Sequence, residues 1–565
     1  MLTAVRRFGD VLLEENQPCV MRDGITLYAD IYRPDKPGRY PVLLMRQPYG
    51  KKIASTITYA HPLWYARQDY VVIIQDVRGR GVSEGEFEPF IREKEDGFDT
   101  VEWAAGLSCS DGQVGMYGFS YQGFTQWAAA AAAPPHLKAI IPAMCGADLY
   151  QGMFYPHGRL ALAEHLPWAF QLARDTARRK GDEAAEAFCT LVRNKTPDEL
   201  IFRMPVGDEH PILTSYFPEF YEWCSHTEYD GYWKERNLLP ELTHSKVPAL
   251  HLGGWYDCFV QGTLQSYETL RQIPGRYDRL MIGPWSHIPW GRHTGGVDHG
   301  PESDGNVHRL HIQWFDYWLK GKRETEWLAE PKITYFELGS RRWNKLEEGS
   351  PFQGAGDAAC RYVLGGTGVP ANGASGGGRL RPEGVSEPDD IVDVFVYDAR
   401  LPMPLESYLP FDRRGVQDRY EILHYTSEIF EQPVSMFGSP KLRVQVQTVS
   451  GATDLVAILS EVGPDGSSRM LSIGRAEVHE TDETEGWATI EMELLSLGVQ
   501  IQPGSALRLE LTGSAFPLFV RHPNGISSAD IHKVGNKSLN IATVAVKSMP
   551  EMPSVLELPI LCTGQ

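Results

Sequence analysis

Residues 115–123 of this sequence are GMYGFSYQG, with Ser120 placed between Gly118 and Gly123. An apolar segment leads into the serine, and a run rich in alanine follows it directly. This order predicts a short strand, a tight turn that holds the serine hydroxyl clear of a sheet, and a helix of small residues. Such an arrangement is typical of the nucleophile elbow of an α/β-hydrolase. One departure stands out, because the simple G-x-S-x-G pattern has glycine where this chain has Gln122.

A serine nucleophile needs a base and an acid that orients the base. In α/β-hydrolases these follow the serine in the order acid, then histidine. The apolar segment at 247–256 ends at Asp257, and the next one, at 280–286, ends at His287. Both residues therefore fall where loops leave the carboxyl ends of parallel strands, the usual place of ligands in open α/β folds. We predict that His287 removes the Ser120 proton, that Asp257 orients the imidazole, and that an acyl-enzyme forms.

The same chemistry requires an oxyanion hole, normally built from the amide after the nucleophile and a donor on the loop that follows the third strand. Tyr121 supplies that amide. The apolar segment at 40–46 runs into Gln-Pro-Tyr-Gly at 47–50, which places Tyr49 at the upper edge of the sheet. Its phenol can point at the oxyanion or belong to an ordinary turn, and position alone leaves both interpretations open.

The remaining histidines and cysteines do not indicate a second chemistry. His308 and His311 are three residues apart on a predicted helix, a spacing that metal ligands use, but no HExxH pattern accompanies them and helix packing explains them. Eight cysteines are scattered without a CxxC pair, which argues against a disulfide framework or a structural zinc site. Cys258, beside the predicted acid, is interpreted as a pocket-wall residue. We expect no metal and no cofactor.

Further motifs surround the predicted triad. They are Arg22–Leu27, Pro48–Tyr49, Gln75–Gly79 with Ser83–Gly85, Glu95–Asp99 with Trp103, Gly118–Gly123, Gly254–Asp257 and Gly283–His287. In these motifs the sequence resembles the family of cocaine esterase and the X-Pro dipeptidyl-peptidases. The family's nucleophile motif is G-x-S-Y-x-G, which accounts for Gln122. The motifs cover the hydrolase part closely, whereas the C-terminal part matches only in general character.

The resemblance implies roles for particular residues. Ser120 is the nucleophile with Asp257 and His287 as its partners, and the Tyr49 hydroxyl and the Tyr121 amide form the oxyanion hole. An apolar acyl pocket is implied around Phe154, Trp168 and Phe259, although each of these aromatics can also be plain core. The family further implies an α/β-hydrolase domain, a helical cap inserted between its strands, and a C-terminal jelly-roll β-sandwich. Relatives often pair, so a homodimer is an expectation.

Length and composition agree with that organisation. A chain of 565 residues is too long for one core and predicts two or three domains. Hydrophobic content of 42% with 22% charged residues is ordinary for a soluble globular protein, and the net charge of −19 argues against nucleic-acid binding. The first residues lack the apolar core of a signal peptide, and no window approaches the length of a membrane span. We therefore expect a cytoplasmic enzyme without a membrane partner.

The pattern along the chain predicts where the domains lie. Strand-like runs precede residue 147, helical stretches follow to about 240, and two more hydrolase strands come after them. Beyond 350, glycine clusters separate short alternating segments such as 441–447 and 507–511, which is typical of a β-sandwich. We predict an α/β-hydrolase domain at 1–146 and 241–350, a helical cap at 147–240, and a jelly-roll β-sandwich at 351–565.

Aromatic pocket walls favour an aryl or bulky apolar acyl group. We predict a serine carboxylesterase acting on small esters of that kind, with an amidase or acylase, an X-Pro dipeptidyl-peptidase or an α-amino-acid ester hydrolase as the alternative. A substrate with a free amino group needs acids near the acyl pocket, whereas Asp257 is followed by Cys-Phe-Val-Gln. Cap acids such as Glu164 can restore that alternative. A catalytically silent scaffold whose β-sandwich binds carbohydrate or a partner is disfavoured, because the triad and both oxyanion donors are present.

Overall fold

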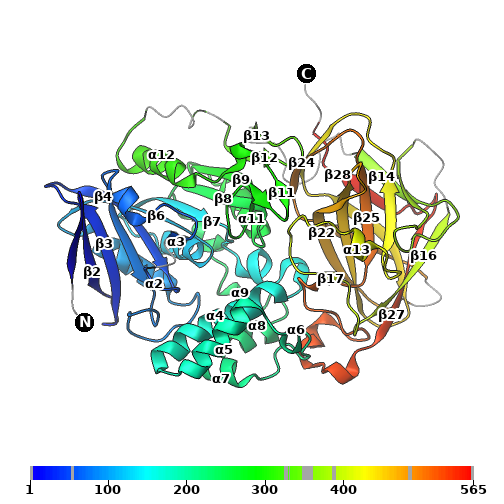
Figure 1. The fold of residues 1–565 in the computed structure, drawn as a ribbon, viewed down its shortest axis with the longest axis horizontal. Helices are drawn as coiled ribbons and strands as arrows, with labels where there is room; N and C mark the ends of the chain where they lie inside the picture. Colours follow the sequence, from blue (N-terminus) through cyan, green and yellow to red (C-terminus); the bar gives the residue numbers. More distant parts are fainter. Residues whose placement is uncertain are drawn as a thin grey trace.

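The computed structural model describes residues 4–52, 56–323, 329, 331–346, 360–384, 390–481 and 486–561. Figure 1 shows three parts: a sheet flanked by helices at the N-terminal side, a group of helices beneath it, and a strand-rich part at the other end. Among the described residues, no helix combines the length and the apolar character needed to cross a membrane.

Eleven of the described strands form one mixed sheet in the first part. In spatial order they are β1 (Val5–Phe8), β2 (Val11–Val20), β3 (Thr26–Pro34), β5 (Val71–Asp76), β4 (Tyr40–Gln47), β6 (Ser110–Phe119), β7 (Leu137–Ala143), β8 (Ala249–Tyr256), β9 (Asp278–Ser286), β12 (Ile333–Glu337) and β13 (Arg342–Leu346). The strands from β5 to β12 in this order pair in parallel. Their carboxyl ends therefore meet at one edge of the sheet.

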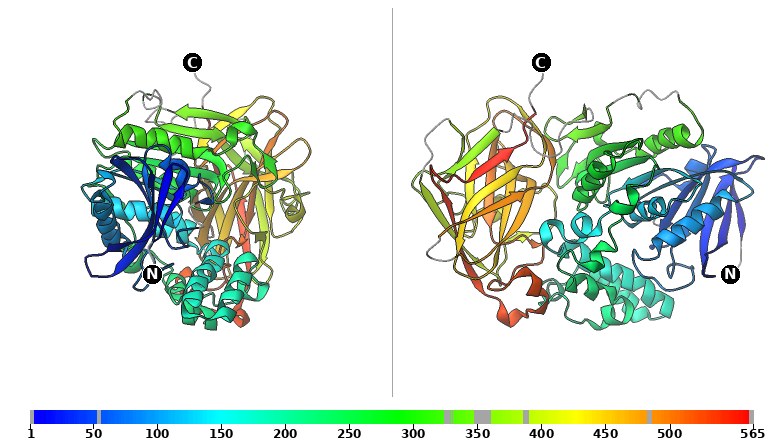
Figure 2. Two further views of the ribbon diagram at one scale, coloured as in Figure 1. Left: turned by 60° about the vertical axis from the view of Figure 1, so that its left-hand side comes forward. Right: turned by 180° about the vertical axis from the view of Figure 1, so that it is seen from behind.

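Helices cover both faces of this sheet (Figure 2). Because successive side chains of a strand point to opposite faces, β4 supplies two cores: Val42 and Leu44 face one, and Leu43 and Met45 face the other. The helices are α2 (Glu93–Ala105) and α3 (Tyr121–Ala132) on the first face, and α1 (Pro62–Ala66) and α12 (Val307–Leu319) on the second. A further helix, α11 (Val260–Leu270), follows β8, and a hairpin of β10 (His293–Thr294) and β11 (Val297–Asp298) with the 3₁₀ turn η4 (Pro301–Ser303) precedes α12.

A run of helices is inserted between β7 and β8, as the sequence pattern predicts. It comprises η2 (Tyr150–Phe154), η3 (Pro156–Gly158), α4 (Leu162–Lys180), α5 (Glu183–Asn194), α6 (Asp198–Ile201), α7 (Pro211–Tyr216), α8 (Glu219–Ser225), α9 (Gly231–Lys234) and α10 (Leu239–Leu242). Gly181 ends α4 with φ of 76°, and the side chain of Asp182 then caps α5 by accepting a hydrogen bond from the Ala185 amide at 2.9 Å. This tight connection packs α4 against α5.

The C-terminal part consists mainly of strands, and its alternating segments are buried on one side. In β20, for example, Leu442, Val444 and Val446 are buried while Lys441 and Arg443 are exposed. The elements are β14 (Cys360–Gly365), β15 (Gly378–Pro382), β16 (Ile391–Asp398), β17 (Pro404–Leu405), α13 (Arg414–Gln417), β18 (Leu423–Ser427), β19 (Val434–Gly438), β20 (Lys441–Thr448), β21 (Thr453–Val462), β22 (Ser468–Val478), β23 (Ala488–Glu493), β24 (Leu497–Ile501), β25 (Ala506–Thr512), β26 (Phe516–Pro517), η6 (Ser528–Lys533), η7 (Asn536–Ser538), β27 (Ile541–Ser548) and β28 (Val555–Leu558). The predicted fold class is confirmed, with a hydrolase core, an inserted helical cap and a C-terminal β-sandwich. The residue limits of these domains stay predictions.

A buried ion-pair cluster joins the cap to the β-sandwich. Arg159, just after η3, donates to Oδ1 of Asp454 at 2.6 Å, and Nε of Arg475 donates to the same oxygen at 2.9 Å. Burial by itself raises the pKa of the Asp454 carboxyl, but the two guanidiniums outweigh it and hold that pKa well below its usual range. The cap is therefore fixed to the C-terminal domain as well as to the hydrolase core.

Candidate active site

Ser120 lies in the turn between β6 and α3, and its backbone is strained. Its φ is 60° and its ψ is −127°, a combination that residues other than glycine rarely adopt. A conformation of this kind costs about 1–3 kcal/mol and persists only where the surrounding structure enforces it. Because β6 ends and α3 begins within one residue, Ser120 stands at the carboxyl edge of the sheet beside a helix N-terminus.

Close packing behind the turn explains why the motif departs from G-x-S-x-G. A Cβ on Gly123 would lie 2.3 Å from the Cys145 sulfur and 2.9 Å from the carbonyl oxygen of Ala143. No side chain fits there, so position 123 requires glycine. Gln122 instead folds back over the turn, where its side-chain oxygen accepts a hydrogen bond from the Phe119 amide at 3.3 Å.

Asp257 and His287 come from the ends of two neighbouring parallel strands. The register of β8 and β9 places Tyr256 opposite Ser286, so the next residue of each strand emerges at the same point. His287 Nδ1 donates to Asp257 Oδ1 over 2.7 Å. The Asp257 side chain is fully buried, whereas that of His287 is 24% exposed. This bond fixes the proton on Nδ1 and leaves Nε2 free to accept one.

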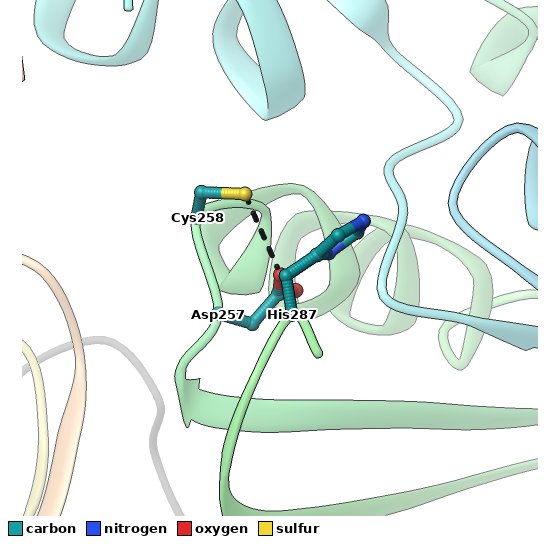
Figure 3. Close-up of side chains that lie close together, drawn as sticks. All are labelled: Asp257, Cys258 and His287. Atoms are coloured by element: carbon teal, nitrogen blue, oxygen red, sulfur yellow. Dashed lines mark hydrogen bonds and ion pairs between the residues drawn. The ribbon is translucent and has the colours of Figure 1, made fainter. Parts of the chain in front are cut away.

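Cys258 forms a compact cluster with these two side chains, as Figure 3 shows. Its thiol donates to Asp257 Oδ1 at 3.7 Å. Burial raises the pKa of this thiol far above its usual value, and the nearby carboxylates of Glu164 and Asp257 raise it further. The side-chain atoms of Asp257, Cys258 and His287 that could bind a metal ion lie within 4.8 Å of one another. The hydrogen bonds among these side chains account for this closeness. Cys258 thus contacts the acid instead of lining the pocket, which corrects our interpretation from the sequence.

Tyr49 and Tyr121 line the same cavity as the serine. The Tyr49 hydroxyl accepts a hydrogen bond from Nε1 of Trp168 at 3.2 Å. Burial raises the pKa of Tyr49 to about 12, with Trp168 and Ser120 partly opposing the shift, so the hydroxyl keeps its proton at neutral pH. Tyr121 is the first residue of α3, where backbone amides have no partner within the helix. Its phenol donates to buried Glu93 at 2.8 Å, which anchors the residue.

A cavity of about 310 Å³ opens at the serine and brings most of the predicted site residues together. Its wall includes Tyr49, Ser120, Tyr121, Trp168, Phe259 and His287. The Trp168 ring stacks on Trp223, with centroids 5.2 Å apart and planes at 10°, and Phe259 meets the His287 ring edge-on at 5.0 Å. These contacts hold the two aromatic walls in fixed orientations.

Phe154 takes a different position from the one that the family resemblance implies. It is fully buried in η2, and its ring packs against His165 with centroids 4.1 Å apart and against Trp223 at 4.8 Å. The residues that line the cavity at this point are its neighbour Met153 and His165. Phe154 therefore supports the wall from behind, because the turn of η2 directs Met153 toward the cavity in its place.

One face of α4 lines the cavity, and it includes Gln171 and Arg174, which our sequence interpretation did not assign, beside Trp168 and Glu164, which it named. Glu164, Trp168, Gln171 and Arg174 follow one another at spacings of four, three and three residues, and all four line the cavity together with Arg193 of α5. Residues at these spacings share one face of a helix. The spacing was visible in the sequence, but only the packed cap shows which face of α4 is turned toward Ser120.

Glu164 brings a carboxyl group close to Asp257 and His287. Burial raises the pKa of Glu164, and Asp257 raises it further, while His287 and Arg193 act in the opposite direction. The β-sandwich reaches this side of the site too, since Tyr408 belongs to the apolar cluster against which Cys258 packs. Burial and the nearby Cys258, Glu164 and Asp257 raise the pKa of the Tyr408 phenol. The C-terminal domain therefore helps to enclose the back of the site.

His308 and His311 lie on α12, away from this cavity. Nδ1 of His311 is 3.2 Å from the Tyr65 hydroxyl, and the His308 ring meets Trp64 edge-on with centroids 4.8 Å apart. Packing between α12 and α1 accounts for both histidines.

Comparisons with known proteins agree with this geometry. The family model described as X-Pro dipeptidyl-peptidase (S15 family) matches residues 23–289, and the one described as X-Pro dipeptidyl-peptidase C-terminal non-catalytic domain matches residues 325–547. Cocaine esterase from Rhodococcus sp. (strain MB1 Bresler) is 31% identical to this chain over 98% of this chain and 99% of its own length. The fold and the site thus define an α/β-hydrolase. The chain belongs to the family of cocaine esterase and the S15 X-Pro dipeptidyl-peptidases, which confirms the predicted resemblance.

Solved structures show the same fold over the whole chain. The structure of an aminopeptidase from the marine sediment archaeon Thaumarchaeota archaeon has a TM-score of 0.79 at 21% identity, covering 99% of this chain and 98% of its own. An α-amino acid ester hydrolase has a TM-score of 0.77 at 22% identity, covering 98% of both chains. At these identities the likeness concerns the fold alone.

Proposed function

We propose that this protein is a serine carboxylesterase that hydrolyses esters with an aryl or bulky apolar acyl group through an acyl-enzyme. One observation carries the proposal: the strained Ser120, the His287 imidazole bonded to Asp257, and the residues that we propose as oxyanion donors, Tyr49 and Tyr121, line one cavity with aromatic walls. Serine ester hydrolysis requires a nucleophile, a base with its orienting acid, and donors for the oxyanion, and this set supports the proposal.

In the proposed reaction, Nε2 of His287 takes the hydroxyl proton as Ser120 Oγ attacks the ester carbonyl. Asp257 is fully buried and accepts from Nδ1 at 2.7 Å, so it stabilises the imidazolium that forms. The Tyr49 hydroxyl and the Tyr121 amide donate to the developing oxyanion, and the N-terminus of α3 favours negative charge at the same place. The alcohol leaves with the proton from His287, and water repeats the sequence on the acyl-enzyme.

The proposed acyl preference rests on the shape of the wall. Trp168 and Phe259 are held by ring contacts with Trp223 and His287, so the cavity offers flat aromatic surfaces. An aryl acyl group buries more area on such surfaces than an acetyl group does, and its ring gains offset or edge contacts in addition.

Glu164 favours a second candidate, the hydrolysis of α-amino-acid esters or of amides with a free amino group. Its carboxyl group lines the cavity next to the triad, where an ammonium group on the acyl part can pair with it. Burial raises the pKa of Glu164, so the charged form that this pairing needs is less favourable than in an exposed glutamate. We therefore rank the hydrolysis of aryl or bulky apolar esters above the hydrolysis of amino-bearing substrates.

The test compares wild type and Ser120→Ala on p-nitrophenyl acetate, phenyl benzoate, an α-amino-acid ester and an Xaa-Pro anilide. Benzoate turnover that exceeds acetate turnover and disappears in the variant supports the aryl esterase. A preference for the amino-bearing substrates that Glu164→Gln removes supports the second candidate. Glu183→Gln on the exposed side of α5 is the matched control for loss of one carboxylate in the cap. Turnover that is unchanged in Ser120→Ala contradicts both candidates.

A further inference from the structure

Charge changes sign along the face of α4 that lines the cavity. Glu164 lies near one end of the helix and Arg174 lies ten residues later, about 15 Å along the axis at 1.5 Å per residue. Trp168 lies between them, and its bond to the Tyr49 hydroxyl marks the level of the proposed oxyanion hole. The cavity is therefore acidic on the triad side of that level and basic on the other side.

Arg193 adds a second positive charge at the basic end. It reaches the cavity from α5, and its Nε donates to Oε1 of Gln171 at 2.8 Å, which leaves the two terminal nitrogens outside this bond. The charge of Arg193 also opposes the upward pKa shifts of Tyr49 and Glu164, so it acts on the same cavity.

Neither guanidinium at this end is neutralised. Three other arginines of the cap form ion pairs, with Asp454 for Arg159, with Asp175 for Arg178 and with Asp208 for Arg203. Arg179 and Arg236 donate to backbone carbonyl oxygens instead. Arg174 and Arg193 form none with any described residue. The chain contains 73 acidic and 54 basic residues, so acidic partners are in excess. Two guanidiniums without an acidic partner in one cavity are suited to bind a planar anion.

We propose that the preferred substrates are esters that carry a carboxylate-type anion on the acyl or the alcohol part, bound by Arg174 and Arg193. This inference rests on the proposed esterase function and narrows its substrate class. Gln171, whose side chain accepts a hydrogen bond from Arg193, is three residues from Trp168, or about 4.5 Å along the helix axis. Arg174 is six residues from Trp168, or about 9 Å along the same axis. That range corresponds to about one para-substituted aromatic ring beyond the ester bond.

Two substrate pairs test the proposal, each comparing an anionic ester with its neutral methyl ester. The mono-4-nitrophenyl ester of terephthalic acid and its methyl ester place the anion on the acyl side. The compounds 4-acetoxybenzoate and methyl 4-acetoxybenzoate place it on the alcohol side. Each kcat/KM is divided by the rate of hydroxide-catalysed hydrolysis of the same ester, so that the ratio of anionic to neutral substrate reports recognition alone.

We expect the normalised kcat/KM of the anionic ester to be about ten times that of the neutral ester in one of the two pairs. Charge-assisted hydrogen bonds are strong, but the opening of the cavity to solvent weakens them. Arg174→Gln and Arg193→Gln each lower the ratio by about threefold, and the double variant brings it near one. Rising NaCl concentration lowers it in the wild type. Arg309→Gln on the exposed side of α12 removes one positive charge elsewhere and leaves the ratio as in the wild type.

The proposal is overturned if both ratios are one or below in the wild type, or if neither arginine variant changes them while neutral esters are hydrolysed. In that case the esterase function stands and only the anion preference fails. If no ester is hydrolysed, the proposed function fails, and binding of monomethyl terephthalate to Ser120→Ala by calorimetry decides the anion site. Binding that weakens about tenfold when Arg174→Gln and Arg193→Gln are both added supports the site. Equal binding contradicts it.

Discussion

Tyr49→Phe removes one donor from the proposed oxyanion hole and leaves the aromatic ring in place. The hydroxyl is protonated at neutral pH, since burial raises its pKa to about 12, so it is a competent donor in the wild type. Loss of one oxyanion donor typically lowers kcat by about 10²–10³, or about 2.7–4 kcal/mol of transition-state stabilisation. The indole of Trp168 also loses its acceptor. Because Trp168 is partly exposed, water can replace that acceptor, and we expect KM to change by less than about threefold.

The assay is steady-state hydrolysis of p-nitrophenyl acetate, with the initial burst of nitrophenol used to count active sites. A lower kcat with an unchanged melting temperature assigns the loss to the transition state. Tyr70→Phe is the control, because its hydroxyl donates to Asp316 of α12 at 2.7 Å, and we expect it to affect stability without changing kcat. A decrease of less than about fivefold in Tyr49→Phe refutes the oxyanion role of this hydroxyl.

Three further predictions concern stability and pH. Ser120→Gly should abolish turnover yet raise the melting temperature, because glycine relieves a backbone strain of about 1–3 kcal/mol at φ of 60°; a lower melting temperature contradicts the strain. Asp454→Asn should destabilise the protein by about 3–5 kcal/mol in denaturant unfolding, since it leaves Arg159 and Arg475 buried without their anion, and a change below about 1 kcal/mol argues against that reasoning. Glu164 has a folded-state pKa above its unfolded value, so its contribution to stability is present at low pH and is lost as pH rises through the folded pKa. Glu164→Gln should therefore gain melting temperature relative to wild type between pH 4 and pH 8, and a constant difference contradicts the shift.

Much of the fold could be predicted from the sequence because its signals are local. The apolar runs at 40–46, 138–142 and 247–256 form β4, β7 and β8, and the change to helical patterns after 147 marks the inserted cap. The N-terminal strands β1 to β3 were not predicted. In β2 the register with β3 shifts between Glu14 and Gln17, and Asn16 has φ of 52°, so polar residues interrupt the alternation that reveals a strand.

The candidate site also has a part that the sequence predicts and a part that it does not. Ser120, Asp257 and His287 are each placed by a strand end, so their order along the chain predicts that they meet at one edge of the sheet. Their catalytic roles stay predictions until variants are assayed. Met153 and Phe154 are consecutive residues of η2, and their side chains point in different directions. No local pattern in the sequence decides which of them faces the cavity.

The sequence by itself determined the elbow, because its signals are local: an apolar strand, a serine between glycines and a helix of small residues follow one another directly. The reason that position 123 must be glycine is tertiary, since Cys145 and Ala143 occupy the space that a side chain would need. The sequence also determined the order of the acid and the base. Only the tertiary structure decided which face of α4 is turned to the cavity, that Cys258 bonds to Asp257, and that Arg193 joins Arg174 from a second helix. These features depend on how the cap packs on the core and on the β-sandwich. Contacts between residues far apart in the chain set that packing, and short-range patterns carry no record of it.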